Sequence, residues 1–414
     1  MFKNLKEIIF CFFTFLILEY GYVYYVIESF SYVGFNSNFN NKIFYNFLLY
    51  IIVFFSSYLI NQERNSDFIK ITLYFNLIFF LFPSLILYKY SHDNQLIVFS
   101  YLALFLFLYI FLNYIKISFV SSTFNIETSK YLILFLSIFL FIPFFISYGL
   151  NFDINTILLA DIYETREDFS SKSNIYLDYT YSLLSKFIAP IGLVFSLIKN
   201  NKLLSLLFTL IIIYMFLITG HKLILFGYFS ILFFYFLNKN ERFIYILISL
   251  NLLLLSSIII FQMLDIPIIP SLIIRRVFFL PSLLDVYYFD FFQNNSINYS
   301  HSFFSSIFNY PYFQSPKDLI SINYFNDFNM SANNGLISDG YMNLGLFGIL
   351  LNLILFSCIM TFIKSLNISM KFYGIVFLFI FSALSSPLST IMVTHGGFIL
   401  LIILNFTIKN TNAD

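Results

Sequence analysis

Residues 199–242 read KNNKLLSLLFTLIIIYMFLITGHKLILFGYFSILFFYFLNKNER. Within this stretch, two apolar runs at 203–219 and 222–238 have basic residues at their far ends and are separated by a turn at Gly220. A hydrocarbon core about 30 Å thick is crossed by roughly 17 to 25 apolar residues of helix. The stretch therefore predicts two membrane-spanning helices joined by a tight turn, with the following basic residues on one side of the membrane: Lys199, Lys202, Lys239 and Arg242.

The composition of the whole chain points the same way. Of 414 residues, 60% are hydrophobic and 10% are charged, and the mean hydropathy is +0.85. Such a chain is too apolar to be a soluble globular domain. The net charge of +1 and the absence of long Lys or Arg runs exclude nucleic-acid binding. Because no metal-ligand spacing or nucleotide fingerprint occurs, we expect no metal and no cofactor.

The same length criterion divides the rest of the chain. It predicts an all-α polytopic membrane protein of about twelve transmembrane helices. The first apolar run lacks a small-residue cleavage site and is expected to be a retained helix. The expected helices are 8–32, 43–60, 68–88, 94–115, 130–149, 180–198, 203–219, 222–238, 243–264, 340–363, 371–387 and 390–408.

The distribution of basic residues orients these helices. With the N-terminus inside, the short outer turns hold only Lys42, Lys89 and Lys222. The cytoplasmic turns hold the majority, as the positive-inside rule requires, and both termini are predicted to be cytoplasmic. These cytoplasmic residues are Lys3, Lys6, Arg64, Lys70, Lys116, Lys130, Lys199, Lys202, Lys239, Arg242, Lys364, Lys371 and Lys409.

Two long outer segments interrupt the helices. The predicted organisation is five helices in 1–149, a first outer loop at 150–179, four helices in 180–264, a large and partly helical outer loop at 265–339, and three helices in 340–414. The remaining cations lie in or beside the two loops, namely Arg166, Lys172, Lys186, Arg275, Arg276 and Lys317. Long loops escape the charge rule, so these cations suggest a binding function.

The first outer loop and the Gly220 turn each present a candidate anion site. In the loop, Arg166 and Glu167 lie in an acidic stretch, where an arginine fork could bind a phosphate or form weak ion pairs at the surface. At the turn, His221 and Lys222 lie near the level of a lipid headgroup and at the start of a helix. The alternative for Lys222 is a side chain that extends to the interface.

The second outer loop carries the strongest local signal. Arg275 and Arg276 are adjacent within the apolar stretch 271–281, which we expect to be a short helix lying in the membrane interface. Such a pair suits a phosphorylated or pyrophosphorylated lipid headgroup, although general attraction to anionic lipid is an alternative. Tyr288 and Asp290 follow, and the tyrosine could stack on a sugar.

A glycine-rich motif leads from this loop into the next helix. Its glycines at 335, 340, 345 and 348 allow close helix packing. The side chains of Asn333, Asn334 and Asp339 could hydrogen-bond sugar hydroxyls, or Asp339 could cap the helix. His301 and His395 are expected to be structural.

Taken in order along the chain, these motifs resemble those of O-antigen polymerases, which join oligosaccharide repeat units. The resemblance covers roughly residues 150–350. The motifs that carry it are the loop with Tyr163 and Arg166, the turn at Gly220, His221 and Lys222, the stretch from Arg275 and Arg276 to Tyr288, and the run from Asn333 and Asn334 through Asp339 and Gly340 to Gly348.

The resemblance implies a GT-C-like glycosyltransferase of the bacterial inner membrane, with both loops periplasmic. It implies transfer of a glycan from undecaprenyl pyrophosphate to a lipid-linked repeat unit, alongside a flippase and a chain-length regulator. Arg275, Arg276 and Arg166 would bind the donor pyrophosphate, and a second group would contact the substrate: Tyr163, His221, Lys222, Tyr288, Asn333 and Asn334.

The general base is not assigned by the resemblance. Candidates are Glu167, Asp290 and Asp339. Related O-antigen ligases carry a histidine where this chain has Asn333 and Asn334, which argues against a histidine base there. A lipid-linked oligosaccharide flippase or other transporter is the alternative function, for which Glu19 and Glu28 are the clearest mid-helix charges. A membrane-bound acyltransferase lacks a convincing His–Asp pair.

Overall fold

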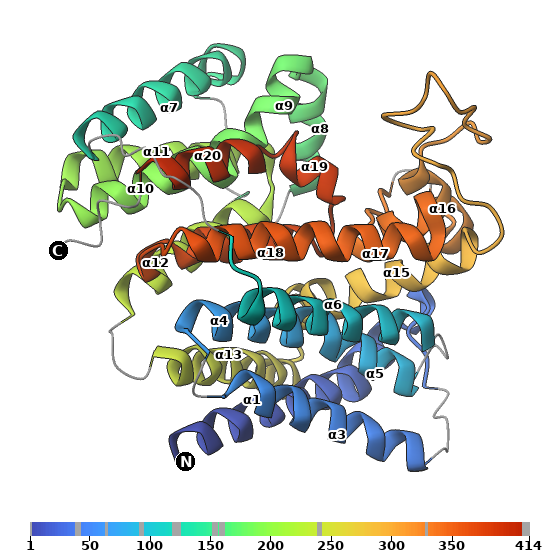
Figure 1. The fold of residues 1–414 in the computed structure, drawn as a ribbon. Helices are drawn as coiled ribbons and strands as arrows, with labels where there is room; N and C mark the ends of the chain where they lie inside the picture. The colour runs from blue at the N-terminus through green and yellow to red at the C-terminus, as the bar shows by residue number, and fades with distance from the viewer. Residues whose placement is uncertain are drawn as a thin grey trace. The chain divides into compact units, whose positions relative to one another are not determined.

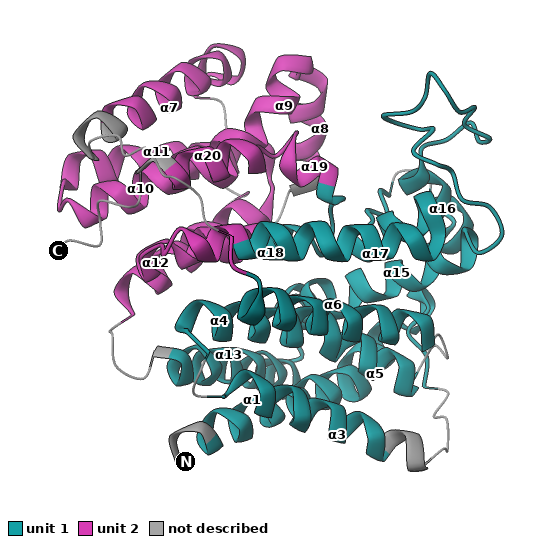
Figure 2. Ribbon diagram, in the orientation of Figure 1, with its two compact units in different colours: residues 1–115, 238–361, 380–388 teal, residues 116–237, 362–379, 389–414 magenta. Residues whose placement is uncertain are grey.

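The computed structural model describes residues 2–37, 43–62, 65–90, 95–117, 126–150, 156, 162–237, 242–327 and 330–407. Every regular element within these ranges is a helix (Figure 1). The chain forms two compact units, each built from segments that are distant in sequence (Figure 2). Unit 1 comprises residues 1–115, 238–361 and 380–388, and unit 2 comprises residues 116–237, 362–379 and 389–414.

Eight described helices are long and apolar enough to cross a membrane. They are Leu5–Val33, Asp67–Tyr90, Gln95–Tyr114, Tyr131–Tyr148, Ile175–Ile198, Lys202–Thr219, Phe243–Leu264 and Leu336–Ser365. Three shorter apolar helices are Phe47–Ile60, Lys222–Phe236 and Met370–Ser382. In a bilayer, a helix satisfies every backbone polar group internally, and the prediction of a polytopic helical membrane protein is therefore confirmed.

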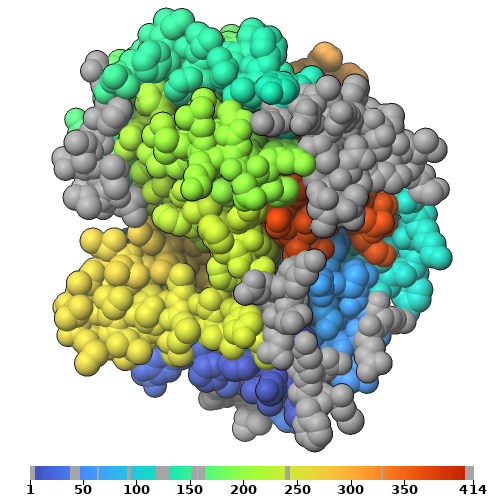
Figure 3. Space-filling model, turned by 90° about the vertical axis from the view of Figure 1, so that its left-hand side faces the viewer, coloured from blue at the N-terminus to red at the C-terminus, as the bar shows by residue number. Residues whose placement is uncertain are grey.

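Unit 1 contains the first four expected spans and the second outer segment, 265–339. Its first long helix joins α1 (Phe2–Gly21), η1 (Tyr22–Ile27), α2 (Glu28–Phe30) and η2 (Ser31–Val33). The others are α3 (Ile43–Ile60), α4 (Asp67–Asn76) continued by η3 (Leu77–Leu81) and α5 (Phe82–Tyr90), α6 (Gln95–Tyr114), α13 (Arg242–Leu264), α14 (Ile268–Pro270) continued by η6 (Ser271–Phe279) and α15 (Leu280–Phe291), and α16 (Pro316–Phe325). Figure 3 shows α13, in yellow, packed against α1, in dark blue.

In unit 2, the other helices pack around the continuous helical segment α9–η5–α10. Its elements are α7 (Ile126–Tyr148), α8 (Ile162–Lys172), α9 (Ile175–Leu183) continued by η5 (Leu184–Ile188) and α10 (Ala189–Ile198), α11 (Lys202–Thr219), α12 (Lys222–Phe236), η7 (Met370–Phe372) and α20 (Gly397–Thr407). The helices α17 (Leu336–Ser365), α18 (Tyr373–Ser382) and α19 (Leu388–Met392) carry the chain between the units. α11 ends at Thr219 and α12 begins at Lys222, which confirms the turn at Gly220.

The end of the chain differs from the sequence prediction. We expected helices at 371–387 and 390–408, but α18 ends at Ser382 and the final segment is divided into α19 and α20. Gly396 interrupts it with a φ of 86°, a backbone conformation that is common only for glycine. Hydropathy cannot detect this break because the residues on both sides are apolar.

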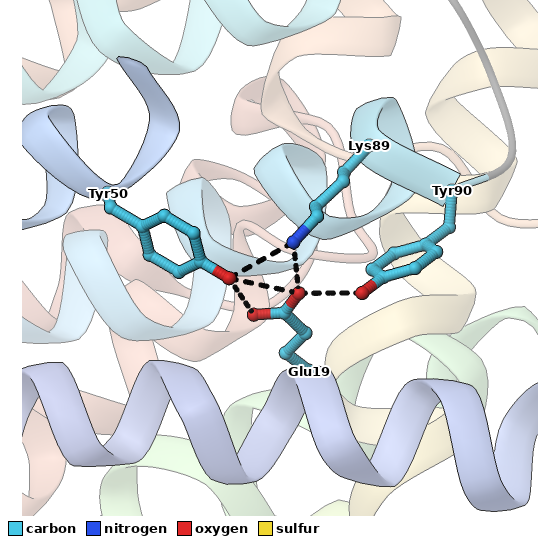
Figure 4. Close-up of polar contacts among 4 residues, drawn as sticks. All are labelled: Glu19, Tyr50, Lys89 and Tyr90. Carbon is cyan, nitrogen blue, oxygen red and sulfur yellow. Dashed lines mark hydrogen bonds and ion pairs between the residues drawn. The ribbon is translucent and has the colours of Figure 1, made fainter. Parts of the chain in front are cut away.

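A buried ion pair joins three helices of unit 1. Lys89 Nζ donates to Glu19 Oε1 at 2.5 Å and to the Tyr50 hydroxyl at 3.0 Å (Figure 4). The hydroxyls of Tyr50 and Tyr90 donate to the Glu19 carboxylate at 3.0 Å and 2.7 Å. The assignment of Lys89 to a short outer turn was wrong, because it lies in the last turn of α5 with only 7% of its surface exposed. Its charge is instead neutralised inside the unit.

Candidate functional site

The glycine-rich motif forms a helical hairpin. Leu344 and Gly345 depart from helical geometry, and Gly345 has a φ of 59°. The residues on either side fold back on each other, since the Asn352 amide donates to the Leu336 carbonyl at 2.9 Å. A straight helix would separate two residues so far apart in sequence by about 24 Å. An apolar helix is present in the expected range 340–363, but its expected start is wrong, because 336–343 is a separate short helix before the bend.

Two glycines make this hairpin possible. A Cβ on Gly340 would lie 2.5 Å from the carbonyl oxygen of Gly348, and a Cβ on Gly348 would meet the carbonyl group of Gly340 just as closely. The two backbones are therefore in direct contact, which only small residues permit. The prediction that these glycines allow close packing is confirmed, with the partner being the other arm of the same hairpin.

The short arm presents Asp339 in a fixed position. Its carboxylate is buried and accepts hydrogen bonds at Oδ1 from the amides of Asn334, at 3.2 Å, and Asn343, at 3.1 Å. Asn343 in turn accepts the backbone N–H of Tyr299 at its side-chain oxygen. Asp339 does not cap the helix, because the helix begins at Leu336, three residues earlier. Its place inside the arm fixes it between the hairpin and the 297–299 segment.

A second buried carboxylate, Asp285 on α15, lies beside this arm. The hydroxyl of Tyr101 on α6 donates to one oxygen of its carboxylate, and the other oxygen has no hydrogen-bond partner among the described residues. Burial raises the pKa of Asp285 to about 6, while the nearby hydroxyls of Ser338 and Tyr101 oppose this shift. A carboxyl group that titrates near neutral pH is suited to proton transfer. Asp285 is therefore a candidate acid or base that the sequence did not identify.

Arg275 and Arg276 lie on the π-helical segment η6. Arg275 donates from Nε to the Ser271 hydroxyl at 3.2 Å, and its guanidinium lies 4.0 Å from the centre of the Phe30 ring. Both arginine side chains are partly exposed. Single-turn π-helical insertions are frequent at functional sites because they redirect side chains within a helix. The π-helical geometry sets the directions in which these two guanidinium groups project.

The segment that carries the arginines does not lie flat on a surface. Phe278 stacks on Phe79, with ring centres 5.0 Å apart and planes inclined by 7°. Phe79 is near the midpoint of the helix Asp67–Tyr90. Phe279 contacts Tyr22 in the first long helix at 4.8 Å. The expectation of a short interfacial helix is therefore wrong, because 268–291 is one continuous helix inserted among the apolar helices of unit 1.

Three other predicted residues of unit 1 have different environments. Tyr288 is fully buried and donates to the Ala332 carbonyl at 2.8 Å, so its ring is not accessible for stacking on a sugar. Asp290 is exposed and accepts a hydrogen bond from the Tyr324 hydroxyl at 2.6 Å. Asn333 is exposed, and its side-chain oxygen accepts a hydrogen bond from Ser331. Of these, only the exposed pair can reach a ligand without rearrangement.

The remaining predicted residues belong to unit 2. Arg166 on α8 donates to the Gly220 carbonyl at 3.3 Å, at the end of α11. His221 stacks on Tyr181, with ring centres 5.4 Å apart. Burial, together with the charges of Arg166 and Lys186, lowers the pKa of His221 to about 3, so this imidazole is neutral at pH 7. Unit 2 thus brings Arg166 close to the turn that carries His221.

Three more predicted positions lie in unit 2. Glu167 is exposed on α8, and Lys222 is the first residue of α12. Tyr163 lies in α8, but its side chain is outside the described part of the structure. None of these three residues is a buried carboxylate of the kind that Asp339 and Asp285 form in unit 1.

Searches of protein-family models, curated proteins and solved structures find no match to this chain.

Proposed function

We propose that this chain is a polymerase of lipid-linked oligosaccharide repeat units in a bacterial inner membrane. In this proposal it has twelve spans in a GT-C-like arrangement, cytoplasmic termini and two periplasmic loops. It transfers a growing glycan from undecaprenyl pyrophosphate to the next lipid-linked unit, for an O-antigen, capsule or similar surface polysaccharide. A flippase delivers the repeat units and a chain-length regulator limits the product.

The observation that supports this proposal best is the position of Arg275 and Arg276. Two adjacent, half-exposed guanidinium groups lie on a helix that packs among apolar helices, and ionisable residues retained in such places usually have a function. A pyrophosphate diester offers the oxygens that a pair of arginine forks binds. The arginines would hold the donor and stabilise the negative charge of the departing pyrophosphate.

The reaction also requires a proton acceptor. The acceptor hydroxyl oxygen forms a bond to the anomeric carbon of the donor glycan, the bond from that carbon to the pyrophosphate oxygen breaks, and the hydroxyl proton passes to a base. Among the three bases considered from the sequence, Glu167 and Asp290 are exposed, whereas Asp339 is buried and held by two amides. Asp339, or the neighbouring Asp285, is the better candidate.

Replacement of either arginine tests the proposal in cells. We expect Arg275→Ala or Arg276→Ala to lower glycan chain extension by about 100-fold or more, since each removes a cation that stabilises the transition state. Single repeat units should still reach the outer face. Chain length is read from gels of the surface polysaccharide, and the sidedness of lipid-linked units from their accessibility to a glycosidase added outside.

The matched control is Lys317→Ala, which removes one exposed positive charge from the same outer segment and should leave extension unchanged. Accumulation of lipid-linked units on the cytoplasmic side in the arginine variants would contradict the proposal.

One observation favours a second candidate, a flippase for lipid-linked oligosaccharides. Transporters place ionisable residues within the helix bundle, and Glu19 and Lys89 form such a pair in unit 1. A flippase would retain cytoplasmic units when this pair is removed. The continuous hydrogen bonding of Glu19 to Tyr50 and Tyr90 favours a structural role for the pair.

A further inference from the structure

Three basic side chains of unit 2 lie close enough for their charges to act on one another. Lys186 lies on the π-helical segment η5, His395 lies in the turn between α19 and α20, and His221 lies between α11 and α12. Lys186 Nζ is 3.2 Å from Nε2 and 3.3 Å from Nδ1 of His395. The segment η5 packs against α7, α11, α12 and α20. The cluster therefore lies among the helices of the unit, with His395 buried and Lys186 and His221 half-buried.

The geometry between Lys186 and His395 is not that of a directed hydrogen bond. Nearly equal distances to both ring nitrogens place the ammonium beside the ring, off the line of either nitrogen lone pair. Two basic groups in such proximity cannot both carry a proton without repulsion. The pair therefore lacks the compensation that a hydrogen-bonded ion pair would supply.

Acidic partners are also missing from the described surroundings. No carboxylate of the described residues forms an ion pair with Lys186, His221 or His395. The guanidinium of Arg166 adds a further positive charge that acts on His221. An excess of basic groups in a poorly solvated place is a feature of anion-binding sites.

The backbone around the cluster also favours the binding of an anion. α12 begins immediately after His221 and α20 begins two residues after His395, and the start of a helix carries partial positive charge. A Cβ on Gly396 would collide with the side chain of Leu183 on α9. The turn that carries His395 is therefore packed directly against the helix that carries Lys186, which fixes the two basic groups relative to each other.

From this cluster we infer that unit 2 holds a binding site for a phosphoryl group, formed by Lys186, His395 and His221. An ammonium with two imidazoles offers compact donors that surround a tetrahedral anion without the planar fork of an arginine. The ligand is the phosphate or pyrophosphate of a lipid headgroup, or the free anion. Its assignment to the pyrophosphate of the second lipid-linked substrate rests on the proposed function, in which Arg275 and Arg276 hold the first.

Calorimetric titration of the full-length chain in phosphatidylcholine nanodiscs tests this inference. The probes are inorganic pyrophosphate and undecaprenyl pyrophosphate. We expect the wild-type chain to bind two equivalents of inorganic pyrophosphate. Lys186→Met should lose one of them, and His395→Gln should weaken the same site by about tenfold, the usual effect of one lost charge-assisted hydrogen bond. Binding of the lipid alone would identify the membrane as the ligand source.

Matched variants separate this site from that of the proposed function. Lys202→Met removes an exposed lysine from the same unit and should change nothing. Lys186→Arg, which keeps the charge, should retain the site and guards against loss of folding. In the double variant Arg275→Ala and Arg276→Ala, the equivalent assigned to Lys186 should remain. Unchanged binding in Lys186→Met and His395→Gln overturns the inference, while unchanged binding in the arginine double variant counts only against the proposed function.

Discussion

Lys89 in unit 1 and Lys186 in unit 2 are two lysines inside apolar helices with opposite surroundings. Lys89 donates to a carboxylate and a hydroxyl, and the same carboxylate accepts from Tyr90. Among the described residues, Lys186 has hydrogen-bond contacts only with the ring of His395. The first lysine is neutralised by the fold and joins three helices. In the proposed site, the charge of Lys186 is neutralised by a bound anion. The partner of a charged side chain thus indicates whether that side chain stabilises the protein or binds a ligand.

The carboxylates of unit 1 extend this contrast. Asp339 is bound by the amides of Asn334 and Asn343, and Asp285 by the hydroxyl of Tyr101. These donors are neutral, unlike the ammonium group that is bound to Glu19. Unit 1 thus places acids among neutral donors, whereas unit 2 places bases together, and the two arrangements suit proton transfer and anion binding respectively.

The largest expected effect on stability comes from a substitution that breaks the ion pair between Glu19 and Lys89. Glu19→Gln leaves Lys89 charged and without its carboxylate, and removal of one partner of a buried ion pair costs about 3–5 kcal/mol. We expect a marked fall in the thermal midpoint of unfolding. The chain has no tryptophan, so unfolding is best followed by the reaction of the buried Cys11 with a thiol-reactive dye.

Two variants control this measurement. Tyr90→Phe removes one hydrogen bond to Glu19 and should cost about 1 kcal/mol. The double variant Glu19→Gln with Lys89→Met removes both charges and should recover part of the loss. A midpoint for Glu19→Gln equal to that of the wild type would show that the pair contributes nothing to stability.

A smaller effect on stability is expected from replacement of Lys186, the lysine without a carboxylate partner. Lys186→Met replaces the uncompensated ammonium by an apolar chain of similar length, and no carboxylate partner is left behind. Replacement of a buried charge in this way is often neutral or stabilising. We expect the thermal midpoint to stay the same or rise. A fall as large as that for Glu19→Gln would mean that Lys186 is a structural element like Lys89.

Much of the fold could be predicted because apolar length and charge asymmetry act locally along the chain. The turn at Gly220 is one example, since it separates two apolar runs that each have basic residues at the far end. The hairpin at Gly345 could not be predicted, because hydropathy does not register a reversal of the chain direction. The same limit concealed the break at Gly396.

The candidate site was predictable only in part. Arg275 and Arg276 are conspicuous because adjacent charges in an apolar stretch are unusual. Asp285 was missed because its partner Tyr101 lies 184 residues away within an apolar helix that shows no polar pattern. The proximity of Lys186 and His395, 209 residues apart, was equally invisible. Contacts of this kind depend on how the helices pack, and a single sequence does not contain a local signal for them.

Extension of lipid-linked repeat units by the purified chain alone tests the proposed function most directly. The protein is placed in nanodiscs with undecaprenyl-pyrophosphate-linked units and without nucleotide sugar, and the products are separated by size. The proposal predicts a ladder of extended glycans, which Arg275→Ala abolishes and Lys317→Ala preserves. Units that remain single while the wild-type chain moves them across the bilayer of a sealed vesicle would contradict it.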